Sequence, residues 1–100
     1  MKNILLICSA GMSTSMLVKK MELAAKEMGE EVRIWAVGDA ETDRNLPEAD
    51  IVLLGPQVRY IKARVEEKVK KQKPVEVINM TDYGTMNGKK VLESALSLLS

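Results

Sequence analysis

The sequence contains no histidine and only one cysteine, and these two absences exclude several kinds of chemistry. Without an imidazole, the chain has no histidine of its own to act as a general base, a zinc ligand or a phosphoryl carrier, which excludes Ser-His and Cys-His mechanisms. A lone cysteine cannot form an internal disulfide. Because neither a second cysteine nor a carboxylate cluster stands at metal-ligand spacing, we expect no metal site.

An excess of charge and long apolar segments are also missing. The 15 basic and 14 acidic residues leave a formal net charge of +1, so no global field draws the protein to nucleic acid or to an anionic membrane. The apolar runs are too short to span a bilayer, and no charged N-terminal segment with an apolar stretch and a cleavage site is present. We therefore expect a cytoplasmic protein with no nucleic-acid partner and no direct membrane insertion.

Strand and helix patterns alternate along a chain whose 100 residues and 46% hydrophobic content suffice for a single domain, residues 1–100. Apolar runs predict strands at residues 3–7, 32–37, 51–54 and 75–78. Apolar residues at helical spacing predict the intervening helices. These residues are Met16, Met21, Ala24 and Met28 before a stop at Gly29, then Val58, Ile61, Val65 and Val69, and finally Val91, Leu92, Ala95, Leu96 and Leu99 in a helix from about Gly88.

Three further local expectations follow from composition. Residues 38–49 have few apolar side chains and several charges, so this connection is predicted to be mostly loop with at most a helical turn. The stretch "TDYG" at residues 81–84 is predicted to be a turn. Most of the seven methionines are predicted to fill the core, and Met12 is the one expected to be exposed.

The character of the strands predicts their order. "NILLI" and "DIVLL" are continuous apolar stretches, whereas "EVRIWAV" and "PVEVI" include polar positions, so the first and third strands should be central. The expected fold is therefore α/β, with a parallel sheet of order 2-1-3-4 and right-handed crossovers. Ligands bind where such an order reverses, beyond the carboxyl ends of the strands. Here that point joins residues 8–15 and 55–57.

The segment "CSAGMSTS", residues 8–15, opens at this switch point. A loop of small residues before a helix turns backbone N–H groups towards an anion, and Gly11 allows the backbone to turn. Ser9, Ser13, Thr14 and Ser15 add hydroxyl donors. The same donors favour the thiolate of Cys8, the form that a nucleophile needs. The alternative is that Cys8 is a small buried residue ending the strand and that the serines only cap the helix.

Three motifs carry a resemblance to a known family. "CSAGMSTS" after an apolar strand, "VLLGPQVRY" at the third strand and "YGTMNG" near the end together resemble the IIB component of the bacterial sugar phosphotransferase system (PTS), in its lactose and cellobiose (chitobiose) branch. The resemblance extends over nearly the whole chain. It implies a single three-layer domain, a four-stranded parallel sheet of order 2-1-3-4 flanked by helices, similar to low-molecular-weight tyrosine phosphatase.

The resemblance also implies a function. Cys8 would accept a phosphoryl group from a phosphohistidine of the IIA component, in a chain of transfers that begins at phosphoenolpyruvate, and would pass it to a sugar on the membrane IIC component. The sugar would be a beta-linked disaccharide such as cellobiose, chitobiose or lactose, and no cofactor is needed. The phosphate would be bound by Ser9, Ala10, Gly11, Met12, Ser13, Thr14 and Ser15. Gln57 and Tyr83 are expected to border the site, because both follow strands at the same edge of the sheet.

Two other functions fit part of this pattern. A low-molecular-weight cysteine phosphatase also has its cysteine between a strand and a helix, but the position of its arginine is Thr14 in this chain. Threonine supplies one neutral donor where arginine would clamp phosphate in a bidentate fork. A flavodoxin-like module would hold a flavin phosphate on such a loop, yet only Trp35, Tyr60 and Tyr83 could flank the flavin ring.

Overall fold

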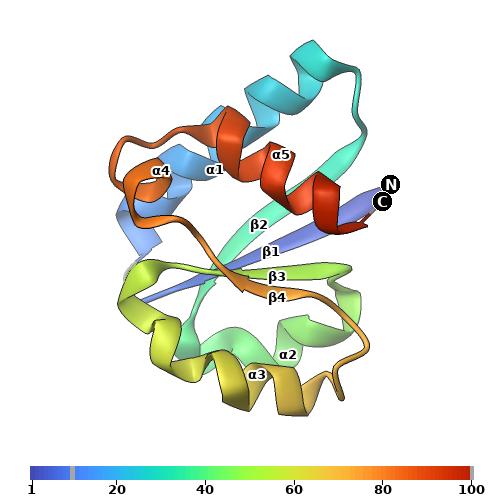
Figure 1. Cartoon of the computed structure of the whole chain (residues 1–100), viewed down its shortest axis with the longest axis vertical. Coiled ribbons are helices and arrows are strands. Elements are labelled where there is room, and N and C mark those ends of the chain that lie inside the picture. The colour runs from blue at the N-terminus through green and yellow to red at the C-terminus, as the bar shows by residue number, and fades with distance from the viewer. Residues whose placement is uncertain (10, 100) are drawn as a thin grey trace.

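The computed structural model describes residues 1–9 and 11–99, and the side chains of Gly11, Met12 and Ser13 lie outside this description. The chain forms one domain around a four-stranded, all-parallel sheet (Figure 1), whose order β2-β1-β3-β4 confirms the predicted 2-1-3-4. The strands are β1 (Lys2–Cys8), β2 (Val32–Gly38), β3 (Ile51–Leu54) and β4 (Val75–Val77). Each predicted strand lies within one residue of these bounds at either end.

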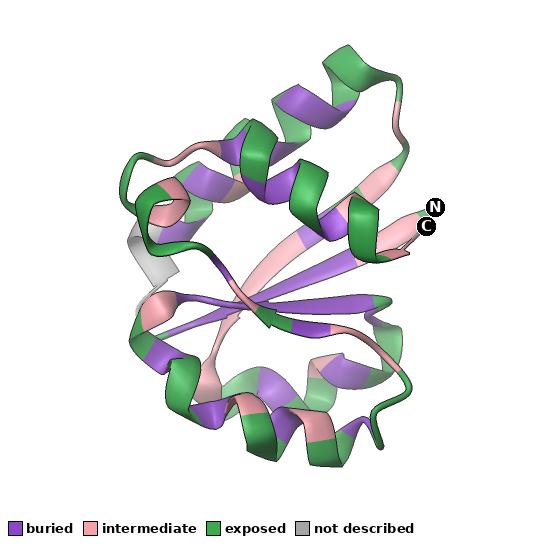
Figure 2. Ribbon diagram, in the orientation of Figure 1, coloured by how far each residue is buried: buried purple, intermediate pink, exposed green. Residues whose placement is uncertain are grey.

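The two central strands are buried on both faces, which explains their continuous apolar sequences. In β1, Ile4 and Leu6 face one core while Leu5 and Ile7 face the other, and all four are 0% exposed. Figure 2 shows this burial along β1 and β3. Fully burying each such side chain stabilises the fold by about 1.5–3 kcal/mol, so the centre of the sheet is its most strongly fixed part.

Helices cover the two faces in separate layers (Figure 1). One face packs against α1 (Gly11–Met28), α5 (Gly88–Leu99) and the short α4 (Met80–Gly84). The other packs against α3 (Lys62–Lys68), the preceding 3₁₀ segment η3 (Pro56–Ile61) and the short turns that follow β2. Among the described residues, no helix combines the length and the apolar character that crossing a bilayer requires.

Gly29 ends α1 as predicted. Its φ of +70° is a left-handed conformation that glycine adopts without the strain of a side chain. The N–H of Glu30 donates to the Ala25 carbonyl at 2.9 Å, and the N–H of Gly29 donates to the Lys26 carbonyl at 3.2 Å. These two hydrogen bonds satisfy two of the last carbonyls of the helix, and the chain then turns towards β2.

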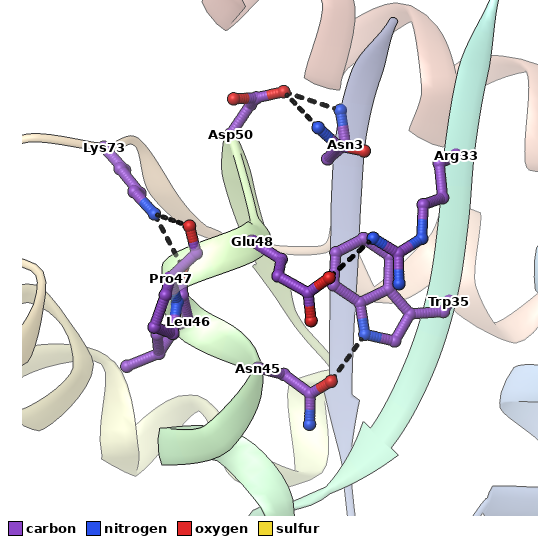
Figure 3. Close-up of polar contacts among 9 residues, drawn as sticks. All are labelled: Asn3, Arg33, Trp35, Asn45, Leu46, Pro47, Glu48, Asp50 and Lys73. Carbon is purple, nitrogen blue, oxygen red and sulfur yellow. Dashed lines mark hydrogen bonds and ion pairs between the residues drawn. The ribbon is translucent and has the colours of Figure 1, made fainter.

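The connection after β2 is helical over most of its length, so the prediction of mostly loop with at most a helical turn was wrong. It consists of η1 (Asp39–Glu41), α2 (Thr42–Asn45) and η2 (Leu46–Glu48). These turns are held by contacts with distant residues (Figure 3): Trp35 Nε1 donates to Asn45 Oδ1 at 2.9 Å, and Lys73 Nζ donates to the Leu46 carbonyl at 2.6 Å. Apolar periodicity contributes little, because only Thr42, Leu46 and Ala49 are buried between residues 39 and 49.

The predicted turn at "TDYG" is also wrong, because it lies inside helix α4. The Asn79 side chain accepts hydrogen bonds from the N–H groups of Thr81 at 2.9 Å and Asp82 at 3.1 Å. This N-cap satisfies two donors that a helix start leaves without partners, and it makes a single helical turn stable where propensity alone would not.

The methionines do not mainly fill the core. Met21 is fully buried, but Met16 and Met80 are 54% and 64% exposed. Met16 stands five residues before Met21, which corresponds to a rotation of about 140° around the helix, so the two side chains face opposite ways. Met12, predicted to be the exposed one, lies outside the described side chains.

The close approach of α5 to α1 depends on Gly88 and gives a stability prediction. A β-carbon at Gly88 would lie 2.6 Å from the Lys20 carbonyl carbon and from the Met21 nitrogen. Gly88→Ala should therefore destabilise the protein by about 1–3 kcal/mol, although alanine favours helix by about 1 kcal/mol. The free energy of unfolding in urea measures the change. Gly84→Ala is the matched control, because nothing lies within 4 Å of its β-carbon. Equal stabilities of the two variants would contradict the close packing.

Candidate functional site

Cys8 lies at the carboxyl end of β1, at the centre of the sheet's carboxyl edge. It stands in register with Gly38 at the end of β2. On the other side, the N–H of Gly55 donates to the Ile7 carbonyl at 2.8 Å, which joins the loop after β3 to the end of β1. A β-carbon at Gly55 would lie 3.6 Å from Cys8 Cβ. The two segments predicted to meet at the switch point therefore do so.

The sulfur of Cys8 is buried and hydrogen-bonded. Both Cys8 and Thr14 are 1% exposed. Thr14 Oγ1 donates to Cys8 Sγ across 2.7 Å. Thr14 is the fourth residue of α1, so the first turn of that helix carries the donor, and the positive end of the helix dipole lies on the same side. Both residues belong to the site predicted from the sequence, but their contact with each other was not predicted.

Tyr83 joins this pair from α4. Its Oη lies 3.4 Å from Thr14 Oγ1, and the side chain is half-buried against the core on the α1 side of the sheet. A threonine hydroxyl has a single proton, and Thr14 directs it to sulfur, so the tyrosine hydroxyl is the donor in the second contact. The order is thus Tyr83 to Thr14 to Cys8. Figure 1 shows α4 and the beginning of α1 at the same end of the sheet.

Asn79 is a contributor that the sequence analysis missed. By capping α4 it fixes the helical turn that carries Tyr83, four residues later. The signal was available, because an asparagine followed three residues later by Asp82 is typical of a helix start. The sequence analysis instead interpreted the same residues as a turn.

Gln57 lies beside the site without a described contact to the sulfur. It belongs to η3 and is exposed. Its Oε1 would be 2.9 Å from a β-carbon on Gly55, so the amide folds back over the glycine that packs against Cys8. Gln57 Oε1 and Cys8 Cβ therefore both border the space that a side chain on Gly55 would occupy.

The predicted phosphate loop is shorter than the sequence indicated, because α1 begins at Gly11. Ser9 is exposed and precedes the helix, Ser15 is exposed in its second turn, and Ala10 lies outside the described residues. Helix geometry leaves the N–H groups of residues 11–13 without intrahelical acceptors, so they form the donor set at this end. Such a helix start suits an anion. Over the described part of the chain, no group of three His, Cys, Asp or Glu side chains could hold a metal ion.

Comparison with known proteins gives consistent matches over the whole chain. A family model described as "PTS system, Lactose/Cellobiose specific IIB subunit" matches residues 3–94. The oligo-beta-mannoside-specific PTS EIIB component of Bacillus subtilis is 48% identical over 100 residues, covering 99% of this chain and 97% of the relative. The galactose-specific EIIB component of Lactococcus lactis subsp. cremoris is 46% identical over 105 residues, with the same two coverages of 99% and 97%.

A solved structure is similar to this chain in both sequence and fold. The solution structure of the cellobiose-specific phosphotransferase IIB component of Borrelia burgdorferi superposes with a TM-score of 0.79 and is 47% identical. The match covers 97% of this chain and 90% of that one. Sequence and fold therefore agree along nearly the full length of the molecule.

Burial of the sulfur leads to a prediction about its reactivity. A bulky aromatic disulfide reagent should modify Cys8 at least about tenfold more slowly in the folded protein than in the urea-unfolded chain, because neighbouring atoms must move before the reagent reaches the sulfur. The double variant Cys8→Ser, Lys19→Cys is the control, since Lys19 is exposed on α1. Its thiol should react at nearly the same rate in both states. Equal rates for Cys8 in the folded and unfolded chains would contradict the buried position.

Proposed function

The chain belongs to the lactose/cellobiose-specific IIB subunits of the sugar phosphotransferase system, and we propose that Cys8 is the residue that carries the phosphoryl group. Cys8 would receive it from a phosphohistidine of the IIA component and deliver it to a sugar bound by the membrane IIC component. The observation that carries this proposal is the hydrogen bond from Thr14 Oγ1 to Cys8 Sγ at the start of α1. It combines a nucleophilic atom with a donor and a helix start suited to phosphate.

In the first transfer the Cys8 thiolate attacks the phosphorus of the donor's phosphohistidine. The S–P bond forms as the P–N bond breaks, and the imidazole keeps the electron pair. No base is needed from this chain, because the departing imidazole can take up the proton that the thiol loses. This accounts for a phosphotransfer protein whose own sequence has no histidine.

The N–H groups of residues 11–13 would hold the transferred phosphate through neutral donors. Ser9, Ser13, Thr14 and Ser15 would contribute hydroxyls, and Gln57 and Tyr83 would border the site. Preorganised donors of this kind stabilise charge on the phosphoryl oxygens during transfer.

In the second transfer a hydroxyl oxygen of the sugar attacks the phosphorus and the S–P bond breaks. The electron pair returns to Cys8 as thiolate, and the hydroxyl proton is released to a base outside this chain. Thr14 would then donate its hydrogen bond to the departing sulfur. Two relatives are named as specific for different sugars, oligo-beta-mannosides at 48% identity and galactose at 46% identity. For this chain we propose a beta-linked disaccharide as the transported sugar.

A carrier must also resist hydrolysis. At Thr14, where a cysteine phosphatase has arginine, the site offers one hydroxyl that is already directed to sulfur. Such a donor gives less stabilisation than a guanidinium to the charge that develops when water attacks. Burial of the sulfur, which is 1% exposed, limits the approach of water in addition. Both features favour a phosphocysteine that persists until an acceptor arrives.

The first functional prediction concerns the site of phosphorylation. After incubation with phosphoenolpyruvate, the general phosphotransferase proteins and a cognate IIA, mass spectrometry should find one phosphate on the wild-type chain and none on Cys8→Ser or Cys8→Ala. Neither replacement is a thiolate at neutral pH. Thermal unfolding of both variants checks that the fold is retained. Undiminished labelling in either variant would refute the assignment, and rapid Cys8-dependent hydrolysis of an aryl phosphate would favour a phosphatase instead.

The second functional prediction isolates the Thr14 hydroxyl. Thr14→Val keeps the shape of the buried side chain and removes the donor, whereas Thr14→Ser keeps the donor. Transfer from the phosphorylated protein to sugar should slow by about tenfold or more in Thr14→Val, because a hydrogen bond to a charged atom is worth about 1.5–3 kcal/mol. Thr14→Ser should stay close to wild type. Single-turnover transfer measures both, and equal rates for Val and Ser would exclude a role for the hydroxyl.

A further inference from the structure

A groove of about 250 Å³ lies between the edge strand β4 and helix α5, outside the Cys8 site. Its apolar part comes from Leu53, Val91 and Leu98, and Leu98 is 44% exposed. Two carboxylates, those of Glu76 on β4 and Asp82 on α4, line the same groove. None of the described residues that line it is a lysine or an arginine. The groove is therefore an apolar depression with a negative border.

The strand that forms one side of this groove has an unpaired edge. β4 is the last strand of the sheet and pairs with β3 alone among the described strands. Backbone N–H and C=O groups on an outer edge are open to an extended segment of another chain. A short edge such as Val75–Val77 accommodates a few residues of such a segment.

The groove is linked to the Cys8 site through α4. Asp82 in the groove and Tyr83 beside Thr14 are consecutive residues of this one-turn helix. Thr14 in turn contacts the sulfur. A partner bound in the groove would therefore lie next to the carboxyl edge from which the phosphoryl group leaves.

We propose that this groove docks an extended cytoplasmic segment of the membrane component that carries an apolar side chain flanked by lysine or arginine. The proposal rests on the proposed function, which requires such a component. Cytoplasmic loops of membrane proteins carry an excess of Lys and Arg, and these cations would pair with Glu76 and Asp82. A second copy of this chain does not fit, because antiparallel pairing of two β4 edges would bring two Glu76 carboxylates together.

The ion pair between Lys62 and Glu76 does not prevent docking of a basic segment in the groove. Lys62 Nζ lies 3.9 Å from Glu76 Oε1, and both side chains are substantially exposed. Ion pairs of this kind contribute little and exchange readily with competing charges. An incoming cation placed by backbone pairing along β4 would therefore replace or share that contact.

The test compares two charge-neutralised variants in the two halves of the reaction. Glu76→Gln, Asp82→Asn removes the carboxylates of the groove, and Glu66→Gln, Glu67→Gln removes the same charge from α3 on the other layer. The first half is phosphorylation of Cys8 by phosphorylated IIA. The second is transfer to sugar in inverted membrane vesicles that contain a IIC component accepting phosphate from the wild-type protein. Free sugar phosphate and phosphoprotein are both quantified.

The groove variant should be phosphorylated by IIA at the wild-type rate, but its transfer to sugar should show a KM for the phosphoprotein raised about fivefold. Its transfer should also depend less on NaCl between about 50 and about 300 mM than wild-type transfer, because screening acts on the lost charges. The α3 variant should match wild type in both halves.

An unchanged KM in the groove variant, or an equal rise in the α3 variant, would overturn the docking proposal. A groove variant slowed equally in both halves would also overturn it, because the charges would then act on the Cys8 site itself. Failure of the wild-type chain to accept phosphate on Cys8 would instead refute the proposed function.

Discussion

The position of every group in the site depends on β1, whose hydrogen bonds to β2 and β3 hold it between them in the sheet. Its side chains are buried on both faces, and the strand cannot shift without moving both cores. Parallel pairing aligns the carboxyl ends of the three strands, so Cys8, Gly38 and Gly55 meet at one edge. The crossover helix α1 then has to begin beside the strand end that it follows. The sulfur of Cys8 is therefore placed by the most stable part of the fold, while its hydrogen-bond donor, Thr14, comes from a helix packed on that part.

The small residues around Cys8 follow from the same constraint. The N–H of Gly55 donates to the Ile7 carbonyl. A β-carbon at Gly55 would lie 2.9 Å from Gln57 Oε1 and at ordinary contact distance from Cys8 Cβ, so even an alanine there would displace the Gln57 amide. The donors of the first turn of α1 approach from the other side. A site built in this way has little freedom to rearrange, which is what stabilising a transferring phosphoryl group requires, since donors that are already in place need no reorganisation.

Much of the fold was predictable because its signals are local or periodic. The continuous apolar runs of β1 and β3 identified the central strands and the strand order, and Gly29 identified the end of α1. The helical turns between residues 39 and 48 were not predictable, because they depend on contacts such as Trp35 with Asn45 and Lys73 with Leu46, which are distant in sequence. The one-turn helix α4 depends on the Asn79 cap, a signal that is weak when no apolar pattern accompanies it.

In the site, too, some features follow from local sequence signals and others depend on contacts between distant residues. The order of the strands sufficed to bring residues 8–15 and 55–57 together, since the carboxyl ends of parallel strands share an edge. The contact between Thr14 and Tyr83 joins residues 69 positions apart, and the burial of Cys8 depends on how closely α1 and α4 approach the sheet. Side-chain packing of this kind is not encoded in a short motif. For that reason the sequence predicted a set of candidate site residues but not which of them touch.

On the proposed function, in which the protein exchanges phosphate with two partners in turn, the burial of Cys8 has a consequence. A sulfur that is 1% exposed is protected from water and from unrelated electrophiles, and it becomes reachable only when neighbouring atoms move. A docked partner supplies binding energy for that movement, whereas a water molecule does not. On the proposed function, selectivity for the correct donor and acceptor would then come from the surfaces that surround the sulfur, because the sulfur itself distinguishes little. Separate surfaces for the two partners would let one carrier respond differently to each while using a single reactive atom.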